Sequence, residues 1–275
     1  MKPGDFRELR YEVDAGVALV TLDRPDRRNA WSGPMAAEYR WALHHAHVDP
    51  AVRGLVLTGA GGDFCAGADT RILRDIDASD GHYERAAVEL PPYPDGSPDG
   101  LRHNHCVPLL ISVPVIAAIE GACAGAGFVL ATYADLRWAA DDAKITSTFA
   151  RLGLPAEYGV AWMLARQVGL PNAMQLLWDA DVRNGVEAAE LGWVQHHLPR
   201  GEVLPSALAY AQRLARESSG LSLATMKRQL LLDAAGDLGS AYDRSVADMD
   251  AALHHPDFRT GLAAQKARTR PDFLA

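Results

Sequence analysis

The sequence contains few cysteines and no long apolar run. Only three of its 275 residues are cysteine, and none has the paired CxxC spacing of a zinc site or a disulfide framework. We therefore expect no metal site and a reducing, cytoplasmic environment. The first residues lack the apolar core of a signal peptide, and no apolar stretch reaches the roughly 18 residues of a membrane span. A soluble, unprocessed protein without membrane contact is expected.

Clusters of positive charge are also missing. The formal net charge is −8, which argues against nucleic-acid binding because phosphate contacts need clustered cations. Neither a phosphate-binding loop ending in GK[ST] nor a GxGxxG turn after a strand occurs. We expect neither nucleotide hydrolysis nor nicotinamide chemistry, and an anionic ligand would depend on local arginines.

What is present is enough apolar sequence for one large core. Apolar residues make up 48% of the chain, which suits a single core with an appended helical part. Short apolar runs at Gly54–Thr58 and Val115–Ile119 are typical of strands buried on both faces of a sheet. Residue patterns predict further strands at Glu8–Asp14 and Val17–Asp23, a helix from Ser32 toward His47, and late helices at Val203–Glu217, Leu221–Ala235, Ser240–Leu253 and a segment ending near Arg270.

Two glycine-containing segments, FCAGADT at Phe64–Thr70 and EGACAGAGFVL at Glu120–Leu130, each follow a predicted strand. Glycine lets the backbone turn tightly and leaves its N–H groups uncovered, so two such turns facing each other can offer two hydrogen bonds to one oxygen. This is the anatomy of an oxyanion hole. Each segment alone is also compatible with an ordinary turn or with close helix packing.

Together with three other motifs, these segments resemble the crotonase family, also called the enoyl-CoA hydratase/isomerase superfamily. The other motifs are VALVTLDRPDRRNA at Val17–Ala30, ARLGLPAEYG at Ala150–Gly159 and RNGVEAAELGWVQHHLP at Arg183–Pro199. The resemblance implies an α/β fold with a ββα spiral core over residues 1–200, which carries acyl-CoA binding and catalysis. It also implies a C-terminal helical oligomerisation region over residues 201–275, and hence a homotrimer or a dimer of trimers.

The same resemblance assigns the binding groups. The oxyanion donors would be the backbone N–H groups of Ala68 and Ala126, which would stabilise the enolate of a thioester. Coenzyme A would enter only as the carrier of the acyl substrate, with no permanently bound cofactor. Residues expected to hold the carrier are Arg24, Arg27, Arg28, Ala30, Ala66, Asp69 and Lys266. The cations among them could instead be ordinary surface charges.

The acid/base positions depart from the hydratase pattern. Where hydratases of the family carry two glutamates, this sequence has Val129 and Phe149, and neither can move a proton. Glu157 falls where dienoyl-CoA isomerases and 4-chlorobenzoyl-CoA dehalogenase carry a functional aspartate, so the resemblance makes it the candidate base. The alternative for Glu157 is a solvated acid ahead of a helix N-terminus.

We further expect an acyl pocket lined by Val129, Phe149, Tyr158, Trp162 and His103. Tyr158 and Trp162 could instead be ordinary core residues, and His103 a solvated surface residue. The segment Ile76–Arg102, rich in Asp, Gly and Pro, is predicted to be a surface loop next to that pocket. A double-bond shift in an enoyl-CoA fits a single carboxylate, and hydration stays plausible. The alternatives are another enolate reaction, such as hydrolysis, decarboxylation or dehalogenation, and an acyl-CoA-binding trimer without catalysis.

Overall fold

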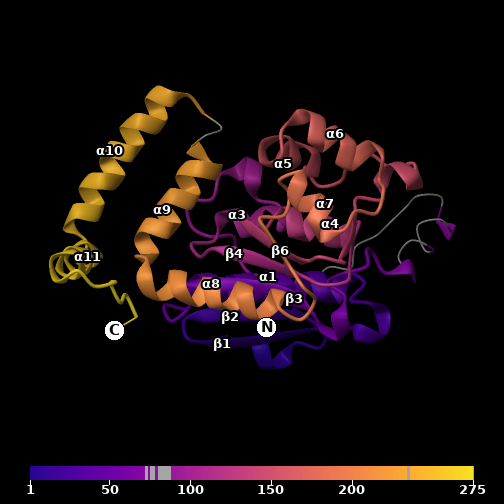
Figure 1. Ribbon diagram of the computed structural model, residues 1–275, viewed down its shortest axis with the longest axis horizontal. Coiled ribbons are helices and arrows are strands. Elements are labelled where there is room, and N and C mark those ends of the chain that lie inside the picture. Colours follow the sequence, from indigo (N-terminus) through magenta and orange to yellow (C-terminus); the bar gives the residue numbers. More distant parts are fainter. Residues whose placement is uncertain (72–73, 75–77, 80–87, 234–235, 275) are drawn as a thin grey trace.

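A six-stranded sheet forms the centre of the molecule in the computed structural model, which describes all residues except 72–73, 75–77, 80–87, 234–235 and 275 (Figure 1). Its strands stand in the order β1-β2-β3-β4-β6-β8, where β1 pairs antiparallel with β2 and all later pairs are parallel. The strands are β1 (Leu9–Asp14), β2 (Val17–Leu22), β3 (Gly54–Gly59), β4 (Val115–Ile119), β6 (Leu136–Ala140) and β8 (His196–Leu198). The four strands predicted from the sequence are confirmed within one residue at each end.

A second, two-stranded parallel sheet lies beside the first. It consists of β5 (Ala122–Ala124) and β7 (Lys144–Thr146). The chain leaves β4 of the large sheet, forms β5 of the small sheet and then enters α4 (Ala126–Thr132). It next forms β6 of the large sheet and β7 of the small sheet, and α5 follows after a 3-10 turn. This repeated winding is the ββα spiral that the sequence predicted.

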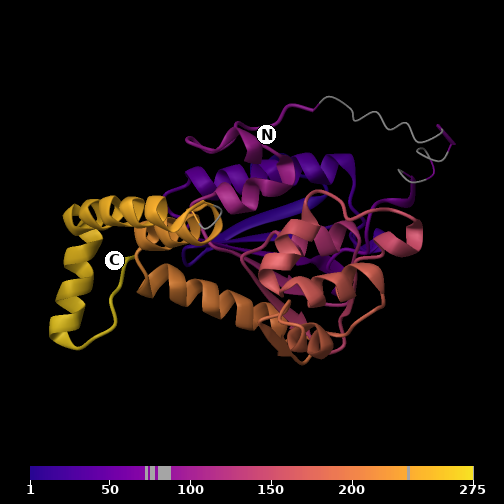
Figure 2. The ribbon, with the colours of Figure 1, turned by 90° about the horizontal axis from the view of Figure 1, so that it is seen from above.

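Helices cover both faces of the large sheet, as Figure 2 shows. α1 (Gly33–Val48) packs on β1 and β2, and α8 (Val203–Glu217) packs on β2, β3, β4 and β6. α8 buries a small apolar residue at every fourth position, namely Val203, Ala207, Ala211 and Ala215, which lets it lie close to the strands. The remaining helices are α3 (Val107–Leu110), α5 (Val160–Gln167), α6 (Leu170–Trp178), α7 (Gly185–Glu190), α9 (Gly220–Leu231), α10 (Leu238–His254) and α11 (Pro256–Ala267).

Side-chain caps fix where several helices begin. The Ser32 hydroxyl accepts a hydrogen bond from the Met35 N–H at 3.1 Å, as expected for the start of α1. α7 has a complete capping box, in which Asn184 and Glu187 each accept from the other's N–H. The cap at Ser32 explains why the start of α1 could be predicted from the sequence.

The last three helices lie at one end of the molecule, where α9 packs against α3, and α10 and α11 extend beyond it (Figures 1 and 2). α9, α10 and α11 confirm the predicted late helices, with boundaries shifted by a few residues. None of their described residues is fully buried in the monomer, although the Lys227 side chain of α9 is only 8% exposed. Residues 201–275 therefore divide into α8, which belongs to the sheet packing, and a projecting part, whose role in oligomerisation stays a prediction.

Part of the predicted loop Ile76–Arg102, residues 76–77 and 80–87, lies outside the described residues. Its later part is anchored on α1. The Arg40 guanidinium donates to Pro91 O at 2.8 Å, and the Trp41 indole donates to Glu89 O at 3.1 Å. Across the described residues, no helix is long and apolar enough to cross a membrane.

Candidate active site

The two glycine-containing turns lie side by side. The Cys65 N–H donates to Ala122 O at 2.8 Å, and Cys65 O accepts from the Ala124 N–H at 3.0 Å. Cys65 thereby forms a parallel β-bridge with Cys123 of β5. The structure thus brings together two segments that are more than fifty residues apart in the sequence.

The tips of the turns touch. Gly67 and Gly125 have positive φ angles of 118° and 49°, and Gly67 Cα lies 3.8 Å from the place that a Cβ at residue 125 would take. Ala68 and Ala126, the predicted donors, directly follow these glycines. Over the described ranges, neither alanine N–H donates to another group of the protein, so both can serve an acceptor from outside the chain.

α4 begins at Ala126, so the positive end of its helix dipole lies at the second predicted donor. The next residue, Gly127, packs against the first turn so closely that a Cβ there would lie 2.3 Å from Cys65 O. Glycine at 127 is therefore required by close packing. Val129 follows on α4 and, like Phe149 at the start of a 3-10 turn, is almost fully buried. Both residues belong to the buried core close to the second turn, and their place in an acyl pocket stays a prediction.

A third segment completes the arrangement around the first turn. The Trp31 N–H donates to Gly67 O at 2.7 Å, and the Asp69 N–H donates to Trp31 O at 2.9 Å. The Ala66 N–H donates to Arg28 O at 3.0 Å. The predicted carrier-binding turn at residues 24–31 is therefore bonded directly to the turn that holds Ala68.

The arginines of that turn differ in how exposed they are and in how strongly they are paired within the chain. Arg24 is buried, with its guanidinium 2.9 Å from Asp69 and 3.3 Å from Glu8, and it donates to Ala30 O at 2.6 Å. Hydrogen bonds from Arg71, with a further one from Arg24, hold the pKa of Asp69 well below its usual range. Arg24 and Asp69 are thus committed to a buried ion network, and their predicted contact with a carrier would have to compete with it.

Arg27 and Arg28 are more open. Arg27 is half exposed and lies 3.8 Å from Asp26, a long ion pair. The exposed Arg28 guanidinium is 2.7 Å from Asp63, and this ion pair raises the pKa of Arg28. Of the predicted cations in this turn, Arg27 has the weakest internal partner.

Glu157 lies on the loop that leads into α5 and is half-buried. Its carbonyl accepts from the Val160 N–H at 3.0 Å, which turns the chain into the helix. The loop begins at the second turn, where Thr148 Oγ1 lies 3.2 Å from the place of a Cβ at residue 125. It ends against the far end of α4, where the Tyr133 hydroxyl donates to Tyr158 O. Glu157 is thus carried along the flank of α4.

The remaining predicted site residues are exposed, and one of them lies far from the two turns. Trp162 faces outward on α5, 46% exposed, with the Arg166 guanidinium 3.4 Å above its ring. His103 and Tyr158 are exposed. Lys266 is exposed on α11, which lies at the opposite end of the molecule from α4 (Figure 1). Lys266 therefore cannot serve the turns of its own chain.

Two organising residues were not identified from sequence. Asn29 is fully buried with φ of 55°. Its side chain accepts from the Arg24 N–H at 2.9 Å and donates to Ala60 O and Asp63 O. The Asp63 carboxylate accepts from the Ala122 N–H at 2.7 Å. Asparagine tolerates a left-handed backbone, so the NA dipeptide ending the first motif was the available signal for Asn29.

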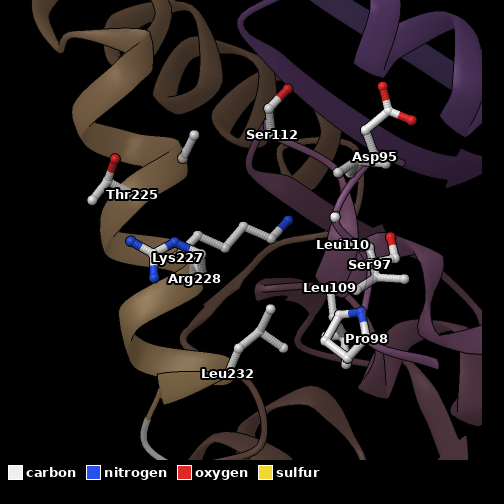
Figure 3. Close-up of a pocket in the computed structure, with 13 residues that line it drawn as sticks. Asp95, Ser97, Pro98, Leu109, Leu110, Ser112, Thr225, Lys227, Arg228 and Leu232 are labelled. Carbon is white, nitrogen blue, oxygen red and sulfur yellow. The ribbon is translucent and has the colours of Figure 1, made fainter. Parts of the chain in front are cut away.

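A cavity of about 240 Å³ lies elsewhere, between α9 and the segments 95–98 and 109–112 (Figure 3). Its two cations already have partners, since Lys227 Nζ is 2.7 Å from Asp135 and Arg228 is paired with Asp233 and Asp248. None of the predicted site residues lines it. We therefore place the candidate active site at the two turns and not at this cavity. Among the described residues, no group of three metal-ligating side chains is assembled.

Comparison with known proteins gives consistent results. A probable enoyl-CoA hydratase of Rhodobacter capsulatus is 34% identical over 98% of both chains, and the 1,2-epoxyphenylacetyl-CoA isomerase of Escherichia coli is 32% identical over 95% of this chain and 96% of its own length. Among solved structures, an enoyl-CoA hydratase from Polaromonas sp. JS666 superposes with a TM-score of 0.82 at 28% identity, covering 96% of this chain and 98% of that one.

The family model for enoyl-CoA hydratase/isomerase matches residues 12–91 and 101–274. These two ranges include the predicted motifs and all three projecting helices. The match is independent of the geometry of the turns, and it agrees with the resemblance noted in the sequence. The chain belongs to the enoyl-CoA hydratase/isomerase family, the crotonase superfamily.

Proposed function

We propose that this protein is an acyl-CoA enzyme that stabilises a thioester enolate and shifts a double bond in, or hydrates, an enoyl-CoA. The observation that carries the proposal is the close approach of the two turns, in which Gly67 Cα lies 3.8 Å from the place of a Cβ at residue 125 and no described group accepts a backbone hydrogen bond from the N–H of Ala68 or Ala126. Two such donors stabilise negative charge that grows on a carbonyl oxygen during reaction. The relatives named as an enoyl-CoA hydratase and an acyl-CoA isomerase support the same class of chemistry.

In this mechanism the thioester carbonyl accepts both N–H groups, while the Glu157 carboxylate removes a proton from carbon. The electrons of the broken C–H bond move into the conjugated system and onto the carbonyl oxygen. The same carboxyl group then returns the proton to another carbon, so that the double bond has moved and no atom is gained or lost. One carboxylate suffices, which fits the apolar residues Val129 and Phe149 at the usual glutamate positions.

The position of Glu157 favours proton transfer beyond the carbon next to the carbonyl. Ala126 stands at one end of α4, and the Glu157 loop is bonded to Tyr133 just past the other end. Seven residues of helix span about 10 Å. An acyl chain running along α4 would therefore present a carbon some way from the thioester to Glu157. This supports a double-bond shift over hydration at the first double bond.

Coenzyme A would be held as the carrier by Arg27 and Arg28, whose side chains are exposed next to the first turn. The backbone around Ala30 and Ala66 would contact the adenine. Lys266 would contribute from another copy of the chain, because α11 lies at the far end of its own molecule (Figure 1). The carrier site is thus proposed to be completed by oligomerisation.

Self-association is supported by α10. Tyr242, Val246, Met249 and Leu253 recur at helical spacing and are each about half exposed or more. Such a continuous apolar stripe is unusual on a monomer surface. We propose that the stripe is covered by a second copy in a homotrimer or a dimer of trimers.

A panel of enoyl-, dienoyl- and aromatic acyl-CoA thioesters, assayed with Glu157→Gln, tests the proposed function. Removal of the base should lower kcat by about 10² to 10⁴ with little change in KM. Glu12→Gln, on the exposed edge of β1, is the matched control and should keep full activity. Turnover that survives in Glu157→Gln would remove Glu157 from the mechanism. Tight binding without any turnover by the wild type would instead identify an acyl-CoA-binding protein.

A further inference from the structure

The loop that carries Glu157 contains backbone positions that favour glycine but are occupied by other residues. Thr148 and Tyr158 have φ angles of 63° and 50°, in the left-handed region that residues with a side chain seldom adopt. Tyr158 directly follows Glu157, so its φ angle sets the direction in which the chain leaves the glutamate. Such a conformation persists only where neighbouring groups hold it.

Tyr133 and His105 both contact Tyr158. The Tyr133 hydroxyl donates to its carbonyl oxygen, and the His105 ring stacks on its phenol ring, with centroids 4.0 Å apart and planes 24° from parallel. The His105 ring is also 6.4 Å from the Tyr133 ring. His105 therefore contacts the side chain of Tyr158, the residue after Glu157, and Tyr133 binds its backbone carbonyl.

The backbone at His105 is fixed by the structure around it. It lies in a 3-10 turn, Asn104–Cys106, in which the Cys106 N–H donates to His103 O at 2.9 Å. The turn continues directly into α3, whose Val107 and Leu109 side chains are buried. α3 in turn packs against α1 and α9. Because this turn and α3 hold the backbone of His105 in place, its imidazole can restrain a loop more than fifty residues later in the sequence.

We propose that His105 is a positioning residue, whose ring stacks on Tyr158 and so holds Glu157 in the direction that proton transfer requires. This inference rests on the proposed function, in which Glu157 is the base. We assign the effect to the stacking face of the ring. A planar ring of similar size should therefore do the same work.

The test compares His105→Phe with His105→Ala. The alanine variant loses the stack and should lower kcat about 10- to 100-fold with little change in KM, because small displacements of a reacting group cost this much. The phenylalanine variant keeps the stack and should stay within about threefold of the wild type. His196→Ala is the matched control. His196 lies in β8, and its ring stacks on the Trp138 ring with centroids 4.4 Å apart. Its replacement should leave kcat unchanged.

Hydrogen exchange of the peptide that spans residues 154–164 gives a readout that needs no turnover. It should be faster in His105→Ala than in the wild type and unchanged in His105→Phe and His196→Ala. Equal exchange in all four proteins overturns the positioning role. Equal loss of kcat in both His105 variants also overturns it, since the ring nitrogens would then be required. A wild type that turns over no thioester removes the proposed function, while exchange still decides whether His105 holds the loop.

Discussion

The carboxylate of Asp63 accepts a hydrogen bond from the backbone N–H of Ala122, a residue 59 positions later in the chain, at 2.7 Å. The other carboxylate oxygen is 2.7 Å from the Arg28 guanidinium. Asp63 therefore joins the predicted carrier-binding turn to the strand that leads into the second donor. One side chain couples the two ends of the candidate site, and this coupling can be tested.

We predict that Asp63→Asn destabilises the protein in a pH-dependent way. The hydrogen bond from Arg28, with further contributions from the Ala122 N–H and from positive charge, holds the pKa of Asp63 below its usual 3.8. The carboxylate thus contributes stability above that usual value, and the contribution is lost as pH falls toward the lower folded-state pKa. Denaturant unfolding should show a deficit of about 1.5 to 3 kcal/mol near pH 7, which shrinks below pH 4.

Asp26→Asn is the control for this measurement. Asp26 is largely exposed and lies 3.8 Å from Arg27, so its replacement should change the free energy of unfolding by less than about 0.5 kcal/mol. A deficit for Asp63→Asn that is constant from pH 3 to pH 7 would show that the charge of Asp63 does not contribute.

Gly127→Ala should separate the two turns. Its Cβ would lie 2.3 Å from Cys65 O and 2.8 Å from the Cys65 Cβ, so the backbone must move. We expect a loss of about 1 to 3 kcal/mol in stability from overpacking, and a kcat about 10² to 10³ lower if a donor moves away from the oxyanion. Gly33→Ala, where nothing lies within 4 Å of the new Cβ, should keep both quantities. Full activity in Gly127→Ala would contradict the proposed oxyanion hole.

The three thiols should be unreactive in the folded protein. All are buried, and burial raises the pKa of Cys65 to about 12 and also raises the pKa values of Cys106 and Cys123. Because the thiolate is the nucleophile, iodoacetamide at pH 8 should label no cysteine of the native protein and all three in guanidinium chloride. Mass spectrometry counts the labels, and rapid labelling of the native protein would show that these sites open.

Oligomerisation should depend on the apolar stripe of α10. Met249→Lys places a charge within the stripe and should reduce the molar mass in solution, measured by light scattering. Ala251→Lys adds the same charge half a turn away on the exposed opposite side of the helix and should not. A wild type that is monomeric at micromolar concentration would contradict the proposed assembly. An assembly that survives Met249→Lys would place the interface elsewhere.

The local elements and both glycine-containing turns followed from the sequence, because their causes are local. Apolar runs determine β3 and β4, Ser32 caps α1, and the four-residue period of α8 determines its buried face. The motifs in their order were also sufficient to identify the family. Nothing in those signals required knowledge of distant contacts.

Only the tertiary structure decided how the residues of the site are used. It committed Arg24 to Asp69 while leaving Arg27 exposed, joined Asp63 to Ala122, and stacked His105 on Tyr158. Each of these outcomes depends on groups some 45 to 60 residues apart that meet when the spiral closes. The energy of such a contact depends on how deeply its two groups are buried and on their distance and orientation. A local pattern of residues determines none of these, so the sequence alone could not predict the contacts.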